Sequence, residues 1–273
     1  MKSCCPALPR PRACQSLTWV SALCVLGGFW RLLRSGRLGL NTSCDDSLQC
    51  FEEASGLAAG RRLAVLGSSV ARGQGARPLE KGWARLLAKA VRPLNVGVAN
   101  HAIGGTTVDA WRGILDGPFV DKLQGVDIAI MSLSLGNEGL ALARTPERIA
   151  AVEQHYLNGL YTIVRRLRET LPRGSRLVLG GPYPHGSYGH QHLQALERVR
   201  EAMLNWEEVD HVIDFLCPGV HGADGMWSKG IQDDPAHPNT EGHARMFDCV
   251  HLEDVLGPAV DAAEGAGDGE DGR

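Results

Sequence analysis

The sequence predicts an α/β protein, a three-layer α/β/α sandwich built on a five-stranded parallel sheet. From residue 62 onward, short apolar runs alternate with longer amphipathic stretches, as in repeated strand–helix–strand units. The apolar run 127–136 carries no charge after Asp127, as expected of a central strand that is buried on both faces. No internal repeat or linker divides residues 61–252, so this stretch is expected to form one domain.

The expected elements alternate along the whole of this stretch. Strands are expected at residues 63–66, 95–102, 127–136, 175–184 and 209–216. Helices are expected at residues 82–91, 106–115, 146–171, 190–206 and 239–252. The longest helix has Pro146 near its start and Gly174 just past its end, where these residues favour helix boundaries. Trp83 and Trp111 fall within expected helices and are interpreted as packing residues.

The composition excludes several classes of protein. The chain has 273 residues, 44% of them hydrophobic and 22% charged, which is ordinary for a globular protein. Its formal net charge of -3 provides no basic surface for nucleic acid, so no nucleic-acid partner is expected. No apolar run reaches the roughly 20 residues that cross a bilayer comfortably, which excludes a protein with several membrane spans.

The two ends of the chain differ from the body in composition. Residues 1–43 contain basic but no acidic residues and carry an apolar run at 17–30. They are interpreted as a targeting or anchor segment: a signal peptide, an uncleaved anchor through 17–33, or an organelle transit peptide. Residues 44–60 are expected to form a linker. Residues 253–273 are acidic and Gly-rich and are expected to form a disordered tail.

The positions of the cysteines bear on the cellular location of the protein. Six of the eight cysteines precede residue 51, so the domain itself is not expected to be a disulfide scaffold. Cys44 and Cys50 are candidates for a short disulfide loop beside the glycosylation triplet that begins at Asn41. These features favour a secretory, endomembrane or extracellular location, with an organelle such as the plastid as the alternative.

Polar residues follow three of the expected strands, where a parallel sheet places its ligands. Ser69 follows the first strand and is a candidate nucleophile. Gly104 and Gly105 follow the second strand, where their N–H groups can donate to a developing oxyanion. Asn137 follows the third strand, and its amide can donate to the same charge without delivering a full positive charge.

A carboxylate and an imidazole stand three residues apart near the end of the domain. Asp234 can reach one nitrogen of His237, which leaves the other free to take a proton from a hydroxyl. Pro238 stiffens this loop, and Asn239 or Thr240 can cap the following helix. The imidazole is therefore expected to stand on a rigid base.

Taken together, the segments resemble the SGNH hydrolases, also called GDSL esterases and lipases, over about residues 61–252. Ser69 matches the family's nucleophile, while Ser68 replaces the aspartate of its Gly-Asp-Ser block. Gly105 matches the glycine of the second block. Gly136, Asn137 and Glu138 match the third block, with Glu138 in place of an aspartate, and Asp234 and His237 match the last block. The resemblance implies the family's flavodoxin-like fold.

The resemblance also implies acyl transfer to water without a cofactor. Ser69, His237 and Asp234 are the expected catalytic residues, and the N–H groups of Ser69 and Gly105 with the Asn137 amide form the expected oxyanion hole. The expected substrate is a small-molecule, carbohydrate or lipid ester. Two alternatives share these residues: an acyltransferase, and a non-catalytic protein that binds a glycan or a partner through the same cleft.

Three further residues are candidates for substrate binding. Tyr183 and His185 lie in a loop after the fourth strand that is expected to cover the mouth of the site. Trp227 precedes His237 by ten residues and is expected either to line the acyl or leaving-group pocket or to be a buried packing residue. The histidines of this loop lack a cysteine or carboxylate that would complete a recognisable metal site, so no metal is expected.

Overall fold

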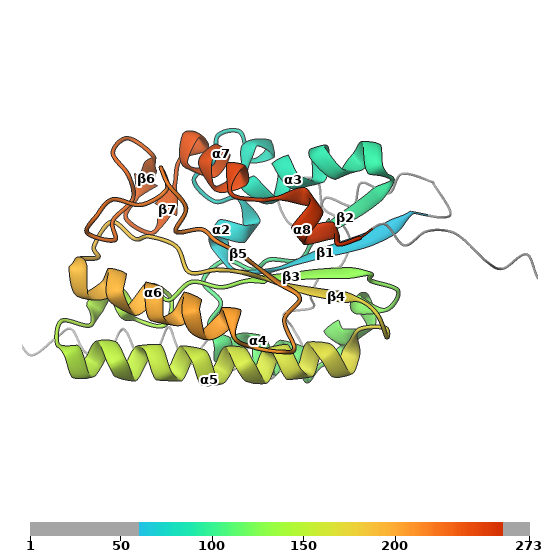
Figure 1. Cartoon of the computed structure of the whole chain (residues 1–273), viewed down its shortest axis with the longest axis horizontal. Coiled ribbons are helices and arrows are strands. Elements are labelled where there is room, and N and C mark those ends of the chain that lie inside the picture. The colour runs from blue at the N-terminus through green and yellow to red at the C-terminus, as the bar shows by residue number, and fades with distance from the viewer. Residues whose placement is uncertain (1–59, 259–273) are drawn as a thin grey trace, which may run out of the picture. The chain divides into compact units, whose positions relative to one another are not determined.

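The computed structural model describes residues 60–258, in which five parallel strands form one sheet (Figure 1). The strands are β1 (Arg61–Gly67), β2 (Val96–Asn100), β3 (Ile128–Ser132), β4 (Arg176–Gly180) and β5 (His211–Ile213). Their order across the sheet is β2-β1-β3-β4-β5, and every neighbouring pair is parallel. The predicted fold class, including the five parallel strands, is confirmed.

Helices cover both faces of the sheet and complete the three layers (Figure 1). The helices are α2 (Ser69–Arg72), α3 (Trp83–Val91), α4 (Val108–Leu115), α5 (Pro146–Thr170), α6 (His190–Leu204), α7 (Thr240–Asp248) and α8 (Leu252–Leu256). Helices α4, α5 and α6 pack on one face, and α2, α3, α7 and α8 pack on the other. Short 3-10 turns occupy Leu79–Lys81, Arg92–Leu94, Pro118–Leu123 and Leu140–Leu142.

Each strand contributes to two hydrophobic cores because its side chains alternate between the faces of the sheet. In β1, Ala64 and Leu66 pack toward α4 and α5, whereas Leu63 and Val65 pack toward α3 and α7. All five residues of β3 are buried, so this strand is covered on both faces, as predicted from its uncharged sequence. Trp83 and Trp111 are fully buried, one in each core, which confirms their interpretation as packing residues.

The strand order places a topological switch point between β1 and β3. The chain leaves β1 for β2 on one side and then crosses to β3 on the other side of β1. In sheets of this order, the crevice outside the carboxyl ends of these two strands binds ligands. Ser69 follows β1 and Asn137 follows β3, so the fold brings both to this crevice.

Several details were not expected from the sequence. A two-stranded antiparallel ribbon, β6 (Gln232–Asp234) with β7 (His237–Pro238), carries the Asp-x-x-His segment. Helix α8 continues the fold past residue 252, the predicted end of the domain, because Val255 and Leu256 are buried against the sheet. The predicted targeting segment, residues 44–59 of the predicted linker with its Cys44–Cys50 loop, and residues 259–273 of the predicted tail lie outside the described residues.

Candidate active site

The turn after β1 presents Ser69 at the carboxyl end of the sheet. The Ser68 N–H donates to the Ser132 carbonyl at 3.1 Å, which ties this turn to the end of β3. Ser69 is the first residue of α2, and Gly73 ends that short helix in the left-handed conformation. Ser69 retains only 6% of its accessible surface, so the residue is buried.

Ser69, His237 and Asp234 form a continuous hydrogen-bonded chain. The Ser69 Oγ lies 2.9 Å from the His237 Nε2. The His237 Nδ1 lies 2.8 Å from Asp234 Oδ2 and 2.9 Å from Oδ1. An ionised carboxylate only accepts hydrogen bonds, so the Nδ1 that faces Asp234 carries a proton, and in that tautomer Nε2 accepts from the Ser69 hydroxyl.

The β6–β7 ribbon holds Asp234 and His237 opposite each other. Asp234 pairs with His237 across the ribbon, and its Oδ1 accepts from the N–H groups of Ala236 at 2.8 Å and His237 at 3.0 Å. Burial acts to raise the pKa of Asp234, but the hydrogen bonds from the His237 ring and these N–H groups outweigh it and lower the pKa. The carboxylate therefore stays ionised at neutral pH.

The loop after α2 packs directly against the histidine loop. Gly75 has φ +97, and a Cβ at this position would lie 2.0 Å from the Pro238 carbonyl oxygen, so only glycine fits there. The Arg77 N–H donates to Thr240 Oγ1 at 2.8 Å, and the Thr240 hydroxyl donates back to the Arg77 carbonyl at 3.1 Å. Asn239 caps α7 by accepting from the Gly242 N–H, as the sequence predicted.

A second histidine, His243, supports this contact from within the core. It is fully buried on α7, where its Nε2 donates to the Gln74 carbonyl at 2.9 Å and its Nδ1 accepts from the Trp83 N–H at 3.4 Å. Burial lowers the pKa of His243 to about 4, so the ring is neutral at physiological pH. His243 lies in the HPNTEGH continuation that the resemblance covers, but its pattern alone did not indicate this role.

The predicted oxyanion donors are the N–H groups of Ser69 and Gly105 and the side-chain amide of Asn137. Gly105 has φ +75 and faces open space, and a Cβ on the neighbouring Gly104 would lie 3.8 Å from the Ser69 Cβ. Among residues 60–258, no carbonyl accepts from the backbone N–H of Ser69 or of Gly105. The Asn137 Nδ2 donates one hydrogen to the Thr106 carbonyl at 2.9 Å, which orients the amide and leaves its second hydrogen available.

Glu138, next to Asn137, binds the far end of the loop that follows Gly105. Its side chain is 2% exposed, and its Oε1 accepts from the Val108 N–H, the first residue of α4, at 2.8 Å. Burial raises the pKa of this carboxyl, although the bond from Val108 and the nearby His155 oppose the shift. Asn137 and Glu138 thus hold the two ends of one short segment, Thr106 to Val108.

The three predicted substrate-binding residues are placed differently from one another. Tyr183 and Trp227 are 4% and 5% exposed, and their rings stack on each other with centroids 6.1 Å apart. His185 is half-buried, and its Nδ1 accepts from the Ser187 N–H at 3.1 Å. Burial lowers the pKa of His185, and the nearby Asp234 carboxylate opposes this shift.

A disulfide joins Cys217, after β5, to Cys249, directly after α7. Sequence reasoning missed it because the two cysteines stand 32 residues apart without any framework spacing. Since α7 begins just after His237, the disulfide ties the helix behind the histidine loop to the edge of the sheet.

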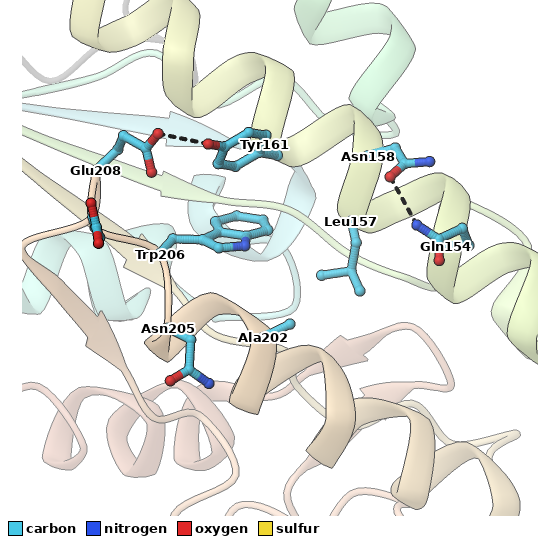
Figure 2. Close-up of a pocket in the computed structure, with 9 residues that line it drawn as sticks. Gln154, Leu157, Asn158, Tyr161, Ala202, Asn205, Trp206 and Glu208 are labelled. Carbon is cyan, nitrogen blue, oxygen red and sulfur yellow. Dashed lines mark hydrogen bonds between the residues drawn. The ribbon is translucent and has the colours of Figure 1, made fainter.

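One described cavity lies apart from this site, between α5 and the end of α6 (Figure 2). It measures about 500 Å³ and is lined on one side by Tyr161, whose hydroxyl donates to Glu208 at 2.7 Å, and by Trp206. None of the predicted site residues lines it. Within residues 60–258, no cluster of three or more His, Cys, Asp or Glu side chains is placed to hold a metal ion. No helix of the same residues is long and apolar enough to cross a membrane.

Several solved structures share this fold. The crystal structure of a protein named TesA is 22% identical and covers 70% of this chain and 96% of its own, with a TM-score of 0.53. The lipase Lip_vut3 from a goat rumen metagenome is 16% identical, with coverages of 69% and 95% and a TM-score of 0.56. The psychrotrophic esterase EstA from Pseudoalteromonas sp. is 17% identical, with coverages of 72% and 96% and a TM-score of 0.52.

A comparison with curated proteins found no match. The model of the GDSL-like lipase/acylhydrolase family, in contrast, matches residues 65–245, a range that contains every residue of the Ser69, His237 and Asp234 chain. Both the match and the fold agree with the resemblance seen in the sequence. The chain therefore belongs to the GDSL-like lipase/acylhydrolase family and is an ester hydrolase of the SGNH type.

Proposed function

We propose that the protein hydrolyses a carboxylic ester through an acyl-enzyme formed on Ser69. The observation that carries this proposal is the unbroken chain from Ser69 Oγ through both nitrogens of His237 to the Asp234 carboxylate. Such a chain activates a hydroxyl that is a weak nucleophile at its free pKa. The ionised state of Asp234 fixes the tautomer that this chemistry needs.

In the first half of the reaction, the Ser69 Oγ attacks the ester carbonyl carbon while its proton moves to His237 Nε2. The carbonyl oxygen becomes an oxyanion, and the N–H groups of Ser69 and Gly105 and the free hydrogen of the Asn137 amide donate to it. As the tetrahedral intermediate collapses, the bond to the leaving oxygen breaks and His237 gives its proton to the departing alcohol. The acyl group remains on Ser69.

In the second half, water replaces the alcohol. His237 Nε2 takes a proton from the water as its oxygen attacks the acyl carbon, and the same donors stabilise the second oxyanion. The carboxylic acid departs, and the proton returns to Ser69 Oγ. Asp234 stays ionised throughout and stabilises the imidazolium that forms twice in each cycle. No cofactor takes part in these steps.

The proposed substrate is a water-soluble ester with a short acyl group. Large exposed hydrophobic side chains among residues 60–258 are few and come from separate elements: Leu94, Leu142, Leu204 and Met226. They form no continuous apolar surface of the kind that marks a lipid interface. Solved structures of this fold include one described as a lipase and one described as an esterase.

We also propose that the protein acts in an oxidising compartment. The Cys217–Cys249 disulfide supports this, because such bonds persist on the secretory route and are rare in reducing compartments. The basic, apolar segment and the glycosylation triplet in the first 43 residues fit the same route.

A panel of p-nitrophenyl esters from acetate to palmitate, with acetylated xylan beside it, tests the proposal. We expect kcat/KM to be highest for the shortest acyl chains and to fall for the longest. Product analysis with added acceptor alcohols tests the alternative transferase, which would form a new ester in place of the free acid. Absence of hydrolysis and of transfer for every member of the panel would contradict the proposal.

A further inference from the structure

Tyr183 occupies a central position among the loops of the proposed active site. It lies in the loop after β4, where it is 4% exposed. Its ring stacks on Trp227 at 6.1 Å and meets the edge of Phe215 at 6.5 Å. A side chain so enclosed offers almost no surface to a substrate, so its place among these loops needs another explanation.

The hydroxyl of Tyr183 connects the nucleophile turn to the oxyanion loop. Its Oη lies 3.3 Å from the Oγ of Ser68, the fully buried neighbour of Ser69. The Ser134 side chain lies near enough to the same hydroxyl to act to lower its pKa, and the Ser134 Oγ accepts from the Gly136 N–H at 3.1 Å. Gly136 directly precedes Asn137. The Tyr183 phenol thus lies between Ser68, which directly precedes the proposed nucleophile, and Ser134, in the loop that leads to Asn137.

The ring of Tyr183 connects this pair of loops to the acid–base loop. Trp227, which stacks on it, donates from its Nε1 to the Pro235 carbonyl at 3.2 Å. Pro235 lies between Asp234 and His237 in the β6–β7 ribbon. Trp227 is itself 5% exposed, so the contact is made inside the protein and not at its surface.

We propose that Tyr183 is a positioning residue that sets the mutual geometry of the loops carrying Ser69, Asn137 and His237. The proposal rests on the function proposed above. Tyr183 does not touch the reacting atoms and acts through Ser68, Ser134 and Trp227. Ser68 directly precedes Ser69. Ser134 accepts from the N–H of Gly136, which precedes Asn137, and Trp227 donates to the carbonyl of Pro235, which lies between Asp234 and His237. Small displacements of catalytic groups are costly, because an error of about 1 Å can lower a rate by about 10²-fold.

The residue type at position 68 supports this assignment. A carboxylate there would be fully buried against the phenol, whereas the serine is neutral and can donate or accept. Burial also raises the pKa of Tyr183, so its hydroxyl keeps its proton and remains a donor over the whole working range of pH. The contact between Ser68 and Tyr183 is thus a neutral hydrogen bond that titration does not break.

The experiment compares Tyr183→Phe and Ser68→Ala with a matched control, Tyr161→Phe. Each tyrosine variant removes one hydrogen-bonded hydroxyl and keeps the ring, but Tyr161 bonds to Glu208 beside the remote cavity. For each variant we measure kcat, KM, the Kd of phenylboronic acid as a tetrahedral transition-state analogue, and the thermal unfolding midpoint. The double variant Ser68→Ala/Tyr183→Phe completes a double-mutant cycle.

We expect Tyr183→Phe to lower kcat about tenfold and to weaken phenylboronic acid binding by a similar factor, with KM changed less than about twofold. Tyr161→Phe is expected to leave all three values unchanged. Ser68→Ala is expected to lower kcat in the same direction, and the double variant to lose less than the product of the two single losses, because both remove one contact.

Two results would overturn the inference. The first is Tyr183→Phe matching Tyr161→Phe in kcat and in boronic acid affinity. The second is a loss of kcat in Tyr183→Phe that is fully explained by the fraction of unfolded protein. In that case the loss in the double variant would equal the product of the losses in Tyr183→Phe and Ser68→Ala. Failure of the proposed function is a separate result, because it would show as wild-type protein without turnover or as Ser69→Ala with wild-type turnover, whatever Tyr183→Phe does.

Discussion

Ser69 Oγ and His237 Nε2 lie 2.9 Å apart although 168 residues separate them in the chain. The strand order brings the turn after β1 to the switch point of the sheet, and the β6–β7 ribbon delivers the imidazole from the far end of the domain. The close approach of Gly75 to Pro238 brings the two loops into contact. This pair of atoms is the relationship on which the proposed chemistry depends.

Replacing Ser69 with alanine removes the proposed nucleophile and nothing else. We expect Ser69→Ala to lower kcat by about 10³-fold or more on any ester that the wild type hydrolyses. Circular dichroism and the unfolding midpoint should match the wild type, because only one hydroxyl is lost. Turnover retained at the wild-type level would refute the nucleophile assignment.

Replacing Asn137 tests the oxyanion donors. We expect Asn137→Ala to lower kcat by roughly 10²- to 10³-fold, because its amide donates to a charge that exists only in the transition state. Asn158→Ala is a suitable control, since this exposed amide bonds only to Gln154 on the surface of α5. A rise in KM at constant kcat would instead place Asn137 in ground-state substrate binding.

Removing the Cys217–Cys249 disulfide tests its contribution to stability. Its 32-residue separation predicts a loss of about 3–4 kcal/mol in the free energy of unfolding for Cys217→Ser/Cys249→Ser, through the greater freedom of the unfolded chain. Denaturant titration of both proteins under non-reducing conditions measures the difference. Equal midpoints, together with two free thiols in the wild type, would show that the bond does not form.

The buried His243 predicts a pH dependence of stability. Its pKa is about 4 in the folded protein and near 6.5 in the unfolded chain. Between these values the unfolded chain binds a proton that the folded protein does not, so stability falls as pH drops from about 6.5 to 4. The loss from this group is about 3 kcal/mol, and it is complete below pH 4.

Denaturant titrations of wild type and His243→Gln between pH 7 and pH 4 measure this contribution as a difference. The variant should show a flatter profile, because glutamine does not titrate. Parallel profiles for the two proteins would mean that His243 does not stay neutral in the folded state.

The sequence predicted the fold because strands that are buried on both faces consist mostly of apolar residues, as β1, β3 and β4 do. It also predicted that Ser69 and His237 lie within hydrogen-bonding distance, and the two side chains are 2.9 Å apart. The ribbon that pairs Asp234 with His237 left no such trace, since its strands are short and polar. The predicted end of the domain was too early for a related reason, because α8 is only five residues long and begins inside an acidic stretch.

The contacts made by Tyr183, Trp227, Glu138 and His243 were beyond the reach of the sequence. Each is a polar or aromatic side chain whose partner lies on a distant segment, and no spacing along one chain encodes such a pair. Tyr183 was expected in a loop over the mouth of the site because it follows the fourth strand, and Trp227 was expected either to line the substrate pocket or to pack in the interior. The structure instead buries both rings against each other, and their role becomes visible only from the partners they hold.

The most direct test of the central claim is labelling with a fluorophosphonate, which reacts only with a serine activated by its neighbours. The site of attachment is identified by mass spectrometry of wild type, Ser69→Ala and His237→Ala. The account predicts label on Ser69 in the wild type, none in Ser69→Ala, and strongly slowed labelling in His237→Ala, because the imidazole supplies the activation. Label on another residue, or equal labelling of Ser69 with and without His237, would contradict it.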